Sequence, residues 1–136
     1  MTGVAKQSVT DYVFDASAIL AILLEEQGAE KAKGFLAQSR FCSSVNVAEV
    51  ITRLTDYGLS DREIDDAVSG LRLDILGFDS DLARNAGLLR RVTRQIGLSL
   101  GDRACLATAA HLKCAAVTAD RIWASLPARL PIRLVR

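Results

Sequence analysis

Four acidic residues stand at the edges of apolar segments, where carboxylates can do chemistry. Asp102 follows Ser99 by three residues and opens an apolar helical pattern, which is the spacing of a capping box. Taken alone, that spacing explains Asp102 as a helix cap, and the helix dipole favours an acid there. Asp15 closes the first β-prone run, Asp120 follows a short apolar run, and Glu49 lies early in a helical pattern. The four positions call for a common explanation.

A divalent cation supplies that explanation. Carboxylates that converge on one site repel one another and raise one another's pKa, so they need a compensating positive charge. Oxygen ligands favour Mg²⁺ or Mn²⁺ over zinc, and Mg²⁺ keeps several waters, so a few carboxylates hold it. Such an ion lowers the pKa of a bound water and neutralises a phosphodiester under attack. Ser17, two residues after Asp15, can supply a hydroxyl, and Asn46 shares a helical face with Glu49.

Each acid also has a purely structural interpretation. Asp15 can cap the helix that follows it, and Glu49 can pair with Arg53 one helical turn later. Asp120 can be a turn residue, a position that aspartate favours. Four further acids fit a solvated helical face and are not candidates for the site: Asp56, Asp61, Asp65 and Asp66. Spacing alone leaves both interpretations open.

The elements that position these residues alternate between strands and helices. The sequence predicts strands at 12–14, 40–43, 73–78, 115–118 and 132–135. It predicts helices at 16–26, 29–38, 45–57 (capped by Ser44), 60–71 and 79–96, then the helix that Asp102 opens and a short helix around Trp123. This alternation indicates parallel strands covered by helices on both faces, an α/β fold. Ligands of parallel sheets collect at the carboxyl ends of the strands, so we expect the four acids to converge there.

Size and composition set further bounds. The chain has 136 residues, half of them apolar, with 17 basic and 16 acidic residues. These values predict one globular domain over residues 11–136, preceded by a flexible polar segment over residues 1–10. The near-neutral balance excludes a strongly basic nucleic-acid coat, so contacts with phosphate must come from local clusters. No apolar stretch fits a membrane span or a signal peptide, so we expect a cytoplasmic protein.

The cysteines and the histidine do not suggest a zinc site. Cys42, Cys105 and Cys114 are odd in number and include no C-x-x-C pair, which fits a reducing compartment. His111, the only histidine, shares a helical face with Cys114, but two ligands do not close a zinc site. A core or surface role is the better interpretation of His111.

Four segments together resemble the PIN domain family and, within it, the VapC-type toxins of bacterial toxin–antitoxin pairs. They are VFDASA (13–18), SVNVAEV (44–50), LSLGDRACLA (98–107) and VTADRIW (117–123). They occur in the family's order from about Tyr12 to the end of the chain. The resemblance implies a three-layer α/β/α fold around a central parallel sheet of four to five strands.

The resemblance also implies an activity, that of a Mg²⁺-dependent endoribonuclease with water as the nucleophile; Mn²⁺ is the alternative ion. By this resemblance four acids bind the metal: Asp15, Glu49, Asp102 and Asp120. Asp15 and Asp102 would be the principal ligands. The residues that position the acids or the water are Ser17, Asn46 and Thr118. Two arginines directly follow acids, and we expect them to meet the RNA backbone: Arg103 and Arg121.

The same resemblance implies partners. Family members are usually homodimers neutralised by a cognate antitoxin, so we expect an RNA substrate, an antitoxin and a second copy of the chain. The apolar run from Ile19 to Leu24 fits an antitoxin groove and, equally well, a buried core helix.

Three other functions would also place an acid at the end of the first strand or retain the same fold. A phosphotransfer domain of the haloacid-dehalogenase type needs a second aspartate where Ser17 stands, and a receiver domain needs an acidic pair where Asp15 is alone. The remaining alternative is a non-catalytic PIN-like module that binds RNA or protein. The intact acids favour the nuclease, and a metal-dependent cleavage assay separates the two.

Overall fold

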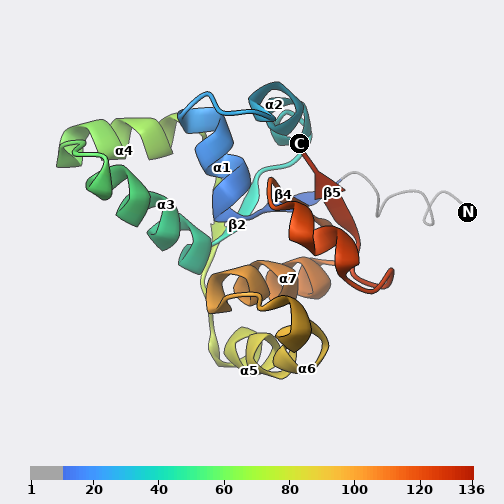
Figure 1. Ribbon diagram of the computed structural model, residues 1–136. Helices are drawn as coiled ribbons and strands as arrows, with labels where there is room; N and C mark the ends of the chain where they lie inside the picture. Colours follow the sequence, from blue (N-terminus) through green and yellow to red (C-terminus); the bar gives the residue numbers. More distant parts are fainter. Residues whose placement is uncertain (1–10) are drawn as a thin grey trace, which may run out of the picture.

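The computed structural model describes residues 11–136 and has a five-stranded parallel sheet at its centre (Figure 1). The strands, in the spatial order β3-β2-β1-β4-β5, are β1 (Tyr12–Phe14), β2 (Phe41–Ser43), β3 (Asp74–Leu76), β4 (Ala115–Thr118) and β5 (Ile132–Leu134). The expected flexible segment, residues 1–10, lies outside the described residues.

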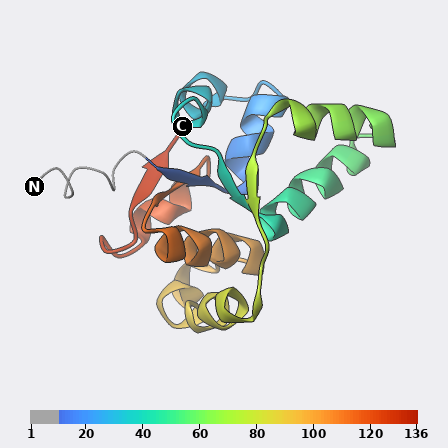
Figure 2. The ribbon, with the colours of Figure 1, turned by 180° about the vertical axis from the view of Figure 1, so that it is seen from behind.

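Helices cover both faces of the sheet (Figures 1 and 2). One face carries α1 (Ala16–Leu23), α2 (Ala29–Leu36), α3 (Ser44–Asp56) and α4 (Asp61–Gly70). The other carries α5 (Ser80–Leu88), α6 (Arg90–Thr93), the 3₁₀ helix η2 (Arg94–Ile96) and α7 (Leu100–Leu112), while a second 3₁₀ helix, η3 (Arg121–Ser125), follows β4. The predicted three-layer α/β/α fold is confirmed. Across residues 11–136, no helix combines the length and the apolar character needed to cross a bilayer.

The core lies on both sides of the central strand β1. Tyr12 and Phe14 pack against the α1–α4 layer, whereas Val13 packs with α7 and Trp123 on the opposite face. Successive side chains of a strand point to opposite faces, so a strand with three buried residues requires both layers. The residues 18–22 of α1 are all buried, which makes α1 a core helix.

Local signals explain most helix starts. Ser60 and Ser99 form complete capping boxes with Glu63 and Asp102. The prediction that Ser44 caps α3 is wrong by one residue. Ser43 caps α3 by accepting from the Val45 N–H, whereas the Ser44 hydroxyl accepts from the Phe78 N–H at 3.2 Å.

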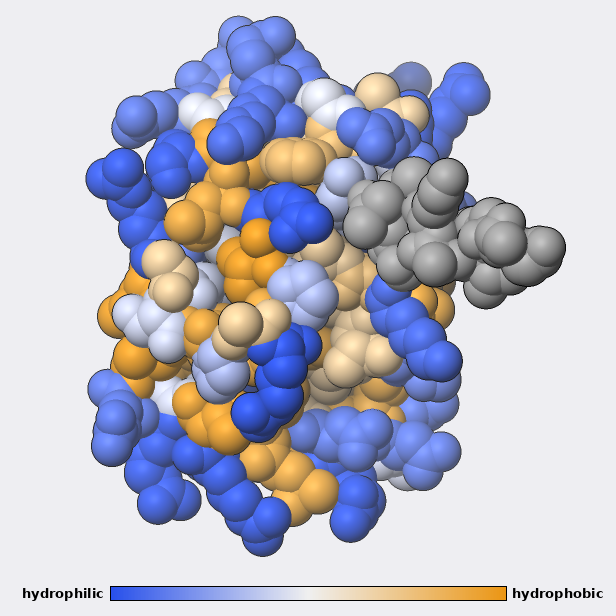
Figure 3. All heavy atoms as spheres, turned by 90° about the vertical axis from the view of Figure 1, so that its right-hand side faces the viewer, coloured by the Kyte–Doolittle hydropathy of each residue, from blue (hydrophilic) through white to orange (hydrophobic). Residues whose placement is uncertain are grey.

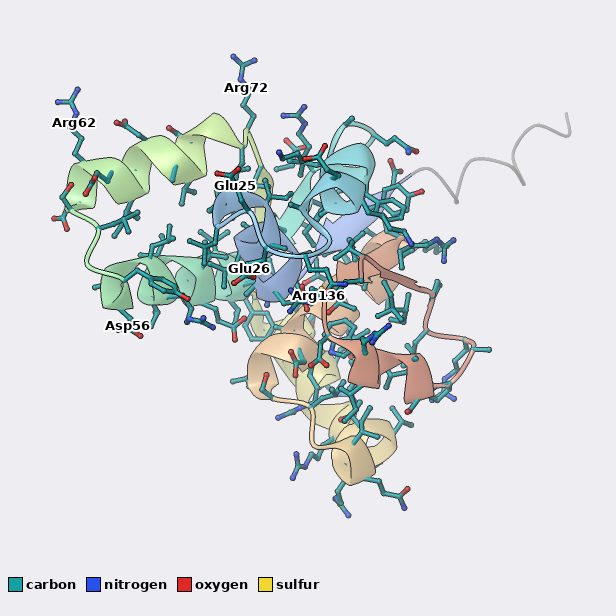
Figure 4. The ribbon with its side chains drawn as sticks, turned by 45° about the horizontal axis from the view of Figure 1, so that its top comes forward. Glu25, Glu26, Asp56, Arg62, Arg72 and Arg136 are labelled. Atoms are coloured by element: carbon teal, nitrogen blue, oxygen red, sulfur yellow. The ribbon has the colours of Figure 1, made fainter. Side chains whose placement is uncertain are left out.

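The C-terminal residues are tied to the turn after α1. Arg136 donates to the carbonyl oxygens of Gln27 and Ala119, both at 3.2 Å, and its guanidinium lies 3.9 Å from Glu26 (Figure 4). Gly28, in the same turn, has φ +96° and lies so close to Val135 that an added Cβ would be 2.6 Å from its carbonyl oxygen. Only glycine adopts this backbone without strain.

Candidate active site

The structure brings all four predicted acids to one cavity of about 380 Å³. Asp15 follows β1 and caps α1, Glu49 lies in the second turn of α3, and Asp102 lies in the first turn of α7. Asp120 follows β4. The N-terminal ends of α1, α3 and α7 meet near the middle of the molecule (Figure 1), and the carboxyl ends of β1 and β4 lead to the same place.

Asp15 is the most deeply buried of the four acids, with 3% of its surface exposed. Its carboxylate accepts hydrogen bonds from the Ala18 N–H at 2.8 Å, from the Ser17 hydroxyl at 2.8 Å and from the Thr118 hydroxyl at 2.5 Å. Burial raises the pKa of Asp15 to about 7, although these three hydrogen bonds lower it, and the charge of Asp102 raises it further. At neutral pH this carboxyl group is therefore divided between its protonated and ionised forms.

Two hydroxyl groups join the start of α1 to the end of β4. The β1–β4 register pairs Phe14 with Val117, which puts Asp15 beside Thr118. The Thr118 hydroxyl donates to Asp15 and accepts from the Asp120 N–H at 3.0 Å. The Ser17 hydroxyl likewise donates to Asp15 and accepts from the backbone N–H of residue 119 at 2.9 Å. The two hydroxyls thus hold the Asp15 carboxylate in one orientation and fix the chain that carries Asp120.

Asn46 connects Glu49 to the start of α7. Its buried side-chain amide donates to Glu49 Oε1 at 2.8 Å and to the Gly101 carbonyl oxygen at 3.0 Å. The Glu49 carboxyl group lies directly against the Gly101 Cα, where a Cβ would overlap it. Burial and the charge of Asp102 raise the pKa of Glu49, while the hydrogen bond from Asn46 lowers it. The alternative pairing of Glu49 with Arg53 does not occur, since Arg53 lies over the Tyr57 ring instead.

Asp102 both caps α7 and lines the cavity. Its Oδ2 accepts from the Ser99 N–H at 2.9 Å, and its own N–H donates to the Ser99 hydroxyl at 3.1 Å, so the capping box is complete. The same half-buried side chain lines the cavity. Asp120 similarly caps η3 through the Ile122 N–H at 3.1 Å while it lines the exposed side of the cavity.

The acids surround the cavity without forming a closed ligand cage. Within residues 11–136, no three Asp, Glu, His or Cys side chains are grouped closely enough to hold a metal ion by themselves. All three cysteines are free and buried.

The two arginines predicted to meet RNA have different surroundings. Arg103 is half-buried and donates to the Ala86 carbonyl oxygen at 3.0 Å, so its guanidinium joins α7 to α5 and does not line the cavity. The expected contact of Arg103 with the RNA backbone stays a prediction. Arg121 is exposed beside Asp120, and its role stays a prediction. Sequence reasoning missed Arg53 as a residue of the cavity wall, although its position one turn after a candidate acid was a usable signal.

Comparison with known proteins identifies the family. The PIN domain model matches residues 12–128. A chain of VapBC2 from Rickettsia felis, bound to a DNA fragment of its promoter, superposes with a TM-score of 0.71 at 16% identity and covers 91% of this chain and 98% of that one. A chain of a toxin–antitoxin complex from Klebsiella pneumoniae superposes with a TM-score of 0.71 at 20% identity, and the match covers 92% of this chain and 98% of that one.

VapBC-5 from Mycobacterium tuberculosis, described as a member of the VapBC family of toxin–antitoxin systems, gives a TM-score of 0.58 at 21% identity and covers 93% of this chain and 98% of that one. A search of curated proteins finds no match. The predicted resemblance is confirmed at the level of the family, because the family model spans most of the sequence and the solved structures share the fold. The chain belongs to the PIN domain family.

Proposed function

We propose that the protein is a Mg²⁺-dependent endoribonuclease and the toxin of a toxin–antitoxin pair. The observation that carries the proposal is the cavity in which carboxylates from four separate segments meet around a buried Asp15. A carboxylate at this depth is costly to ionise unless a positive charge is bound beside it. Membership of the PIN domain family supports the nuclease.

The donor set suits a hard cation. Every candidate ligand is a carboxylate oxygen, which favours Mg²⁺ or Mn²⁺. Mg²⁺ is commonly held by one or two carboxylates and several waters, so a closed cage is unnecessary. Asp15 and Asp102 would hold the ion, with Glu49 and Asp120 on the remaining sides; the Asp102 cap uses Oδ2 and leaves Oδ1 for this purpose. When bound, the ion supplies charge neutralisation for a phosphodiester and a water of lowered pKa.

The chain's own residues orient the reaction. The hydroxyls of Ser17 and Thr118 hold the Asp15 carboxylate, and Asn46 holds the Glu49 carboxylate. Glu49, whose pKa is raised, is suited to take a proton from the attacking water at the cavity wall. Asp120, the most exposed of the four acids, stands at the cavity mouth, where the substrate enters.

Partners follow from the same proposal. The solved neighbours from Klebsiella pneumoniae and Rickettsia felis are toxin–antitoxin and VapBC complexes, which supports a cognate antitoxin for this chain. RNA as substrate, a homodimer and a cytoplasmic location belong to the proposal as expectations from the family.

Cleavage of a pool of cellular RNA by purified, antitoxin-free protein tests the function. The reaction is run with Mg²⁺, with EDTA, and with the variant Asp15→Asn; Asp65→Asn, which makes the same chemical change on the exposed face of α4, is the matched control. Discrete cuts that need both the metal and Asp15, and survive in the control, are expected. A folded, Mg²⁺-binding protein that leaves all RNA intact would instead favour the non-catalytic binding module.

A further inference from the structure

The surface of α5, α6 and η2 carries a cluster of positive charges without any acid. Residues 82–101 contain four arginines and no acid, whereas the rest of the chain has thirteen basic and sixteen acidic residues. All four are exposed, and none takes part in an ion pair within residues 11–136: Arg84, Arg90, Arg91 and Arg94. We call these four residues the basic surface.

The basic surface is built on a rigid support. Leu82 and Ala86 of α5 are buried against Ala107 of α7, and the buried Thr93 donates its hydroxyl to the Leu89 carbonyl oxygen. The Arg103 guanidinium adds a second link between α7 and α5. The arginines therefore project from helices that are fixed to the same helix, α7, that carries Asp102.

The basic surface is also close to the cavity along the chain. η2 ends at Ile96, and Ser99, which is bonded to Asp102, follows three residues later. Asp102 comes eight positions after Arg94 in the chain, so their Cα atoms lie within about 29 Å of each other even for a fully extended chain. Figures 1 and 2 agree that α5 and α6 lie directly beside α7.

The opposite end of the molecule has the opposite charge. Residues 56–66 contain five acids and one arginine, and they form the end of α3 and the start of α4, far from α5 and α6 (Figure 1). The cavity itself is lined by four carboxylates and one arginine. A polyanion is repelled by the acidic end and by the carboxylates of the cavity, whereas the basic surface attracts it.

We propose that the basic surface docks the RNA by binding backbone phosphates outside the cavity, and so guides the strand to the acids. The inference rests on the proposed nuclease function and extends it to a second region of the chain. Arginine suits this role because its planar guanidinium binds phosphate oxygens in pairs.

A second copy of the chain is the rival occupant of this region. Leu88 and Val92 are 38% and 37% exposed on the same helices, and Figure 3 shows apolar side chains between hydrophilic ones at the lower end of the molecule. In a twofold interface, however, the same arginines would face one another without any acid to compensate them. The charge pattern therefore favours RNA.

RNA binding at several salt concentrations tests the proposal. All proteins carry Asp15→Asn, so that the fluorescent single-stranded RNA is bound without being cut. The test variant adds Arg90→Gln, Arg91→Gln and Arg94→Gln. The control removes the same charge from exposed positions elsewhere: Lys31→Gln, Lys33→Gln and Arg62→Gln, the last of which points away from the molecule in Figure 4.

Each phosphate contact contributes about 0.7 to the slope of log affinity against log salt for a single strand, so the test variant is expected to lose about 2 from that slope. The control is expected to keep the slope of the parent. Equal slopes in the test variant and the parent would overturn the proposal, and so would a test variant that loses self-association in light scattering and keeps its RNA affinity.

Cleavage by otherwise wild-type protein separates this proposal from the nuclease itself. If the wild type cuts long RNA and the triple arginine variant cuts it equally well, docking fails and the nuclease stands. If the wild type never cuts but the triple variant still loses the salt slope, the nuclease fails and docking stands.

Discussion

Replacing Gly101 by alanine is expected to damage catalysis while leaving the fold intact. Gly101 lies in the first turn of α7, and the Glu49 carboxyl group occupies the space that a Cβ would need. That carboxyl must move by about 1 Å to regain ordinary van der Waals separation. The movement breaks the alignment of Glu49 with Asn46, which also binds the Gly101 carbonyl oxygen.

The two effects of this substitution differ greatly in size. Alanine is favoured over glycine in a helix by about 0.5–1 kcal/mol, and the displaced atoms are the flexible end of one side chain, so the free energy of unfolding should change by less than about 1 kcal/mol. A misplacement of about 1 Å in a catalytic group, in contrast, costs about 10²-fold in rate.

Single-turnover cleavage and urea unfolding, measured on the same samples, test this expectation. Gly34→Ala is the matched control, since Gly34 lies inside α2 and an added Cβ meets no atom within 4 Å. The control should keep full activity. The reasoning is refuted if Gly101→Ala cleaves at the wild-type rate, or if it loses activity only because it no longer folds.

Three further predictions concern stability and pH. Burial raises the pKa of Asp15 from 3.8 to about 7, so its contribution to the stability of the metal-free protein is fully present below pH 3.8 and is lost as the pH rises through about 7. In urea unfolding, Asp15→Asn should therefore flatten the dependence of the free energy of unfolding on pH over this range. An unchanged dependence would contradict the burial argument. Because the metal needs the ionised carboxylate, calorimetry should find tighter Mg²⁺ binding as the pH rises through about 7, and pH-independent binding would exclude Asp15 as a ligand. Gly28→Ala should lower the free energy of unfolding by about 1–3 kcal/mol, because φ is +96° and the Cβ meets the Val135 carbonyl oxygen; thermal melting checks this, and an unchanged midpoint would argue against the close contact.

Patterns that are local in the chain were predictable. The capping boxes of α4 and α7 depend on residues three apart, and both occur as expected. The convergence of the four acids could also be predicted from the sequence, because parallel strands direct their carboxyl ends to one edge of the sheet whatever the details of packing. Order of elements and strand alternation are therefore enough to bring together acids that are more than a hundred residues apart.

Contacts that depend on distant packing were not predictable. Arg103 follows an acid in the sequence, but only the packing of α7 on α5 reveals that its guanidinium reaches Ala86. The predicted helix 79–96 divides into α5, α6 and η2. The side chain of Thr93 bonds to the Leu89 carbonyl oxygen near that division, a bond that competes with regular helix geometry. Gly101 has no side chain to analyse, so its contact with Glu49 is invisible before the helices are packed.

The position of β4 next to the central strand has a consequence for synthesis on the ribosome. β1, β2 and β3 are translated in order and are neighbours in the sheet, but β4 pairs with β1 from its other side and brings Asp120 with it. At about 5–20 residues per second, about 5–20 s pass between the translation of Asp15 and that of Asp120. During this interval a nascent chain can pair three of the five strands, but the acidic cavity stays incomplete until β4 and Asp120 are added.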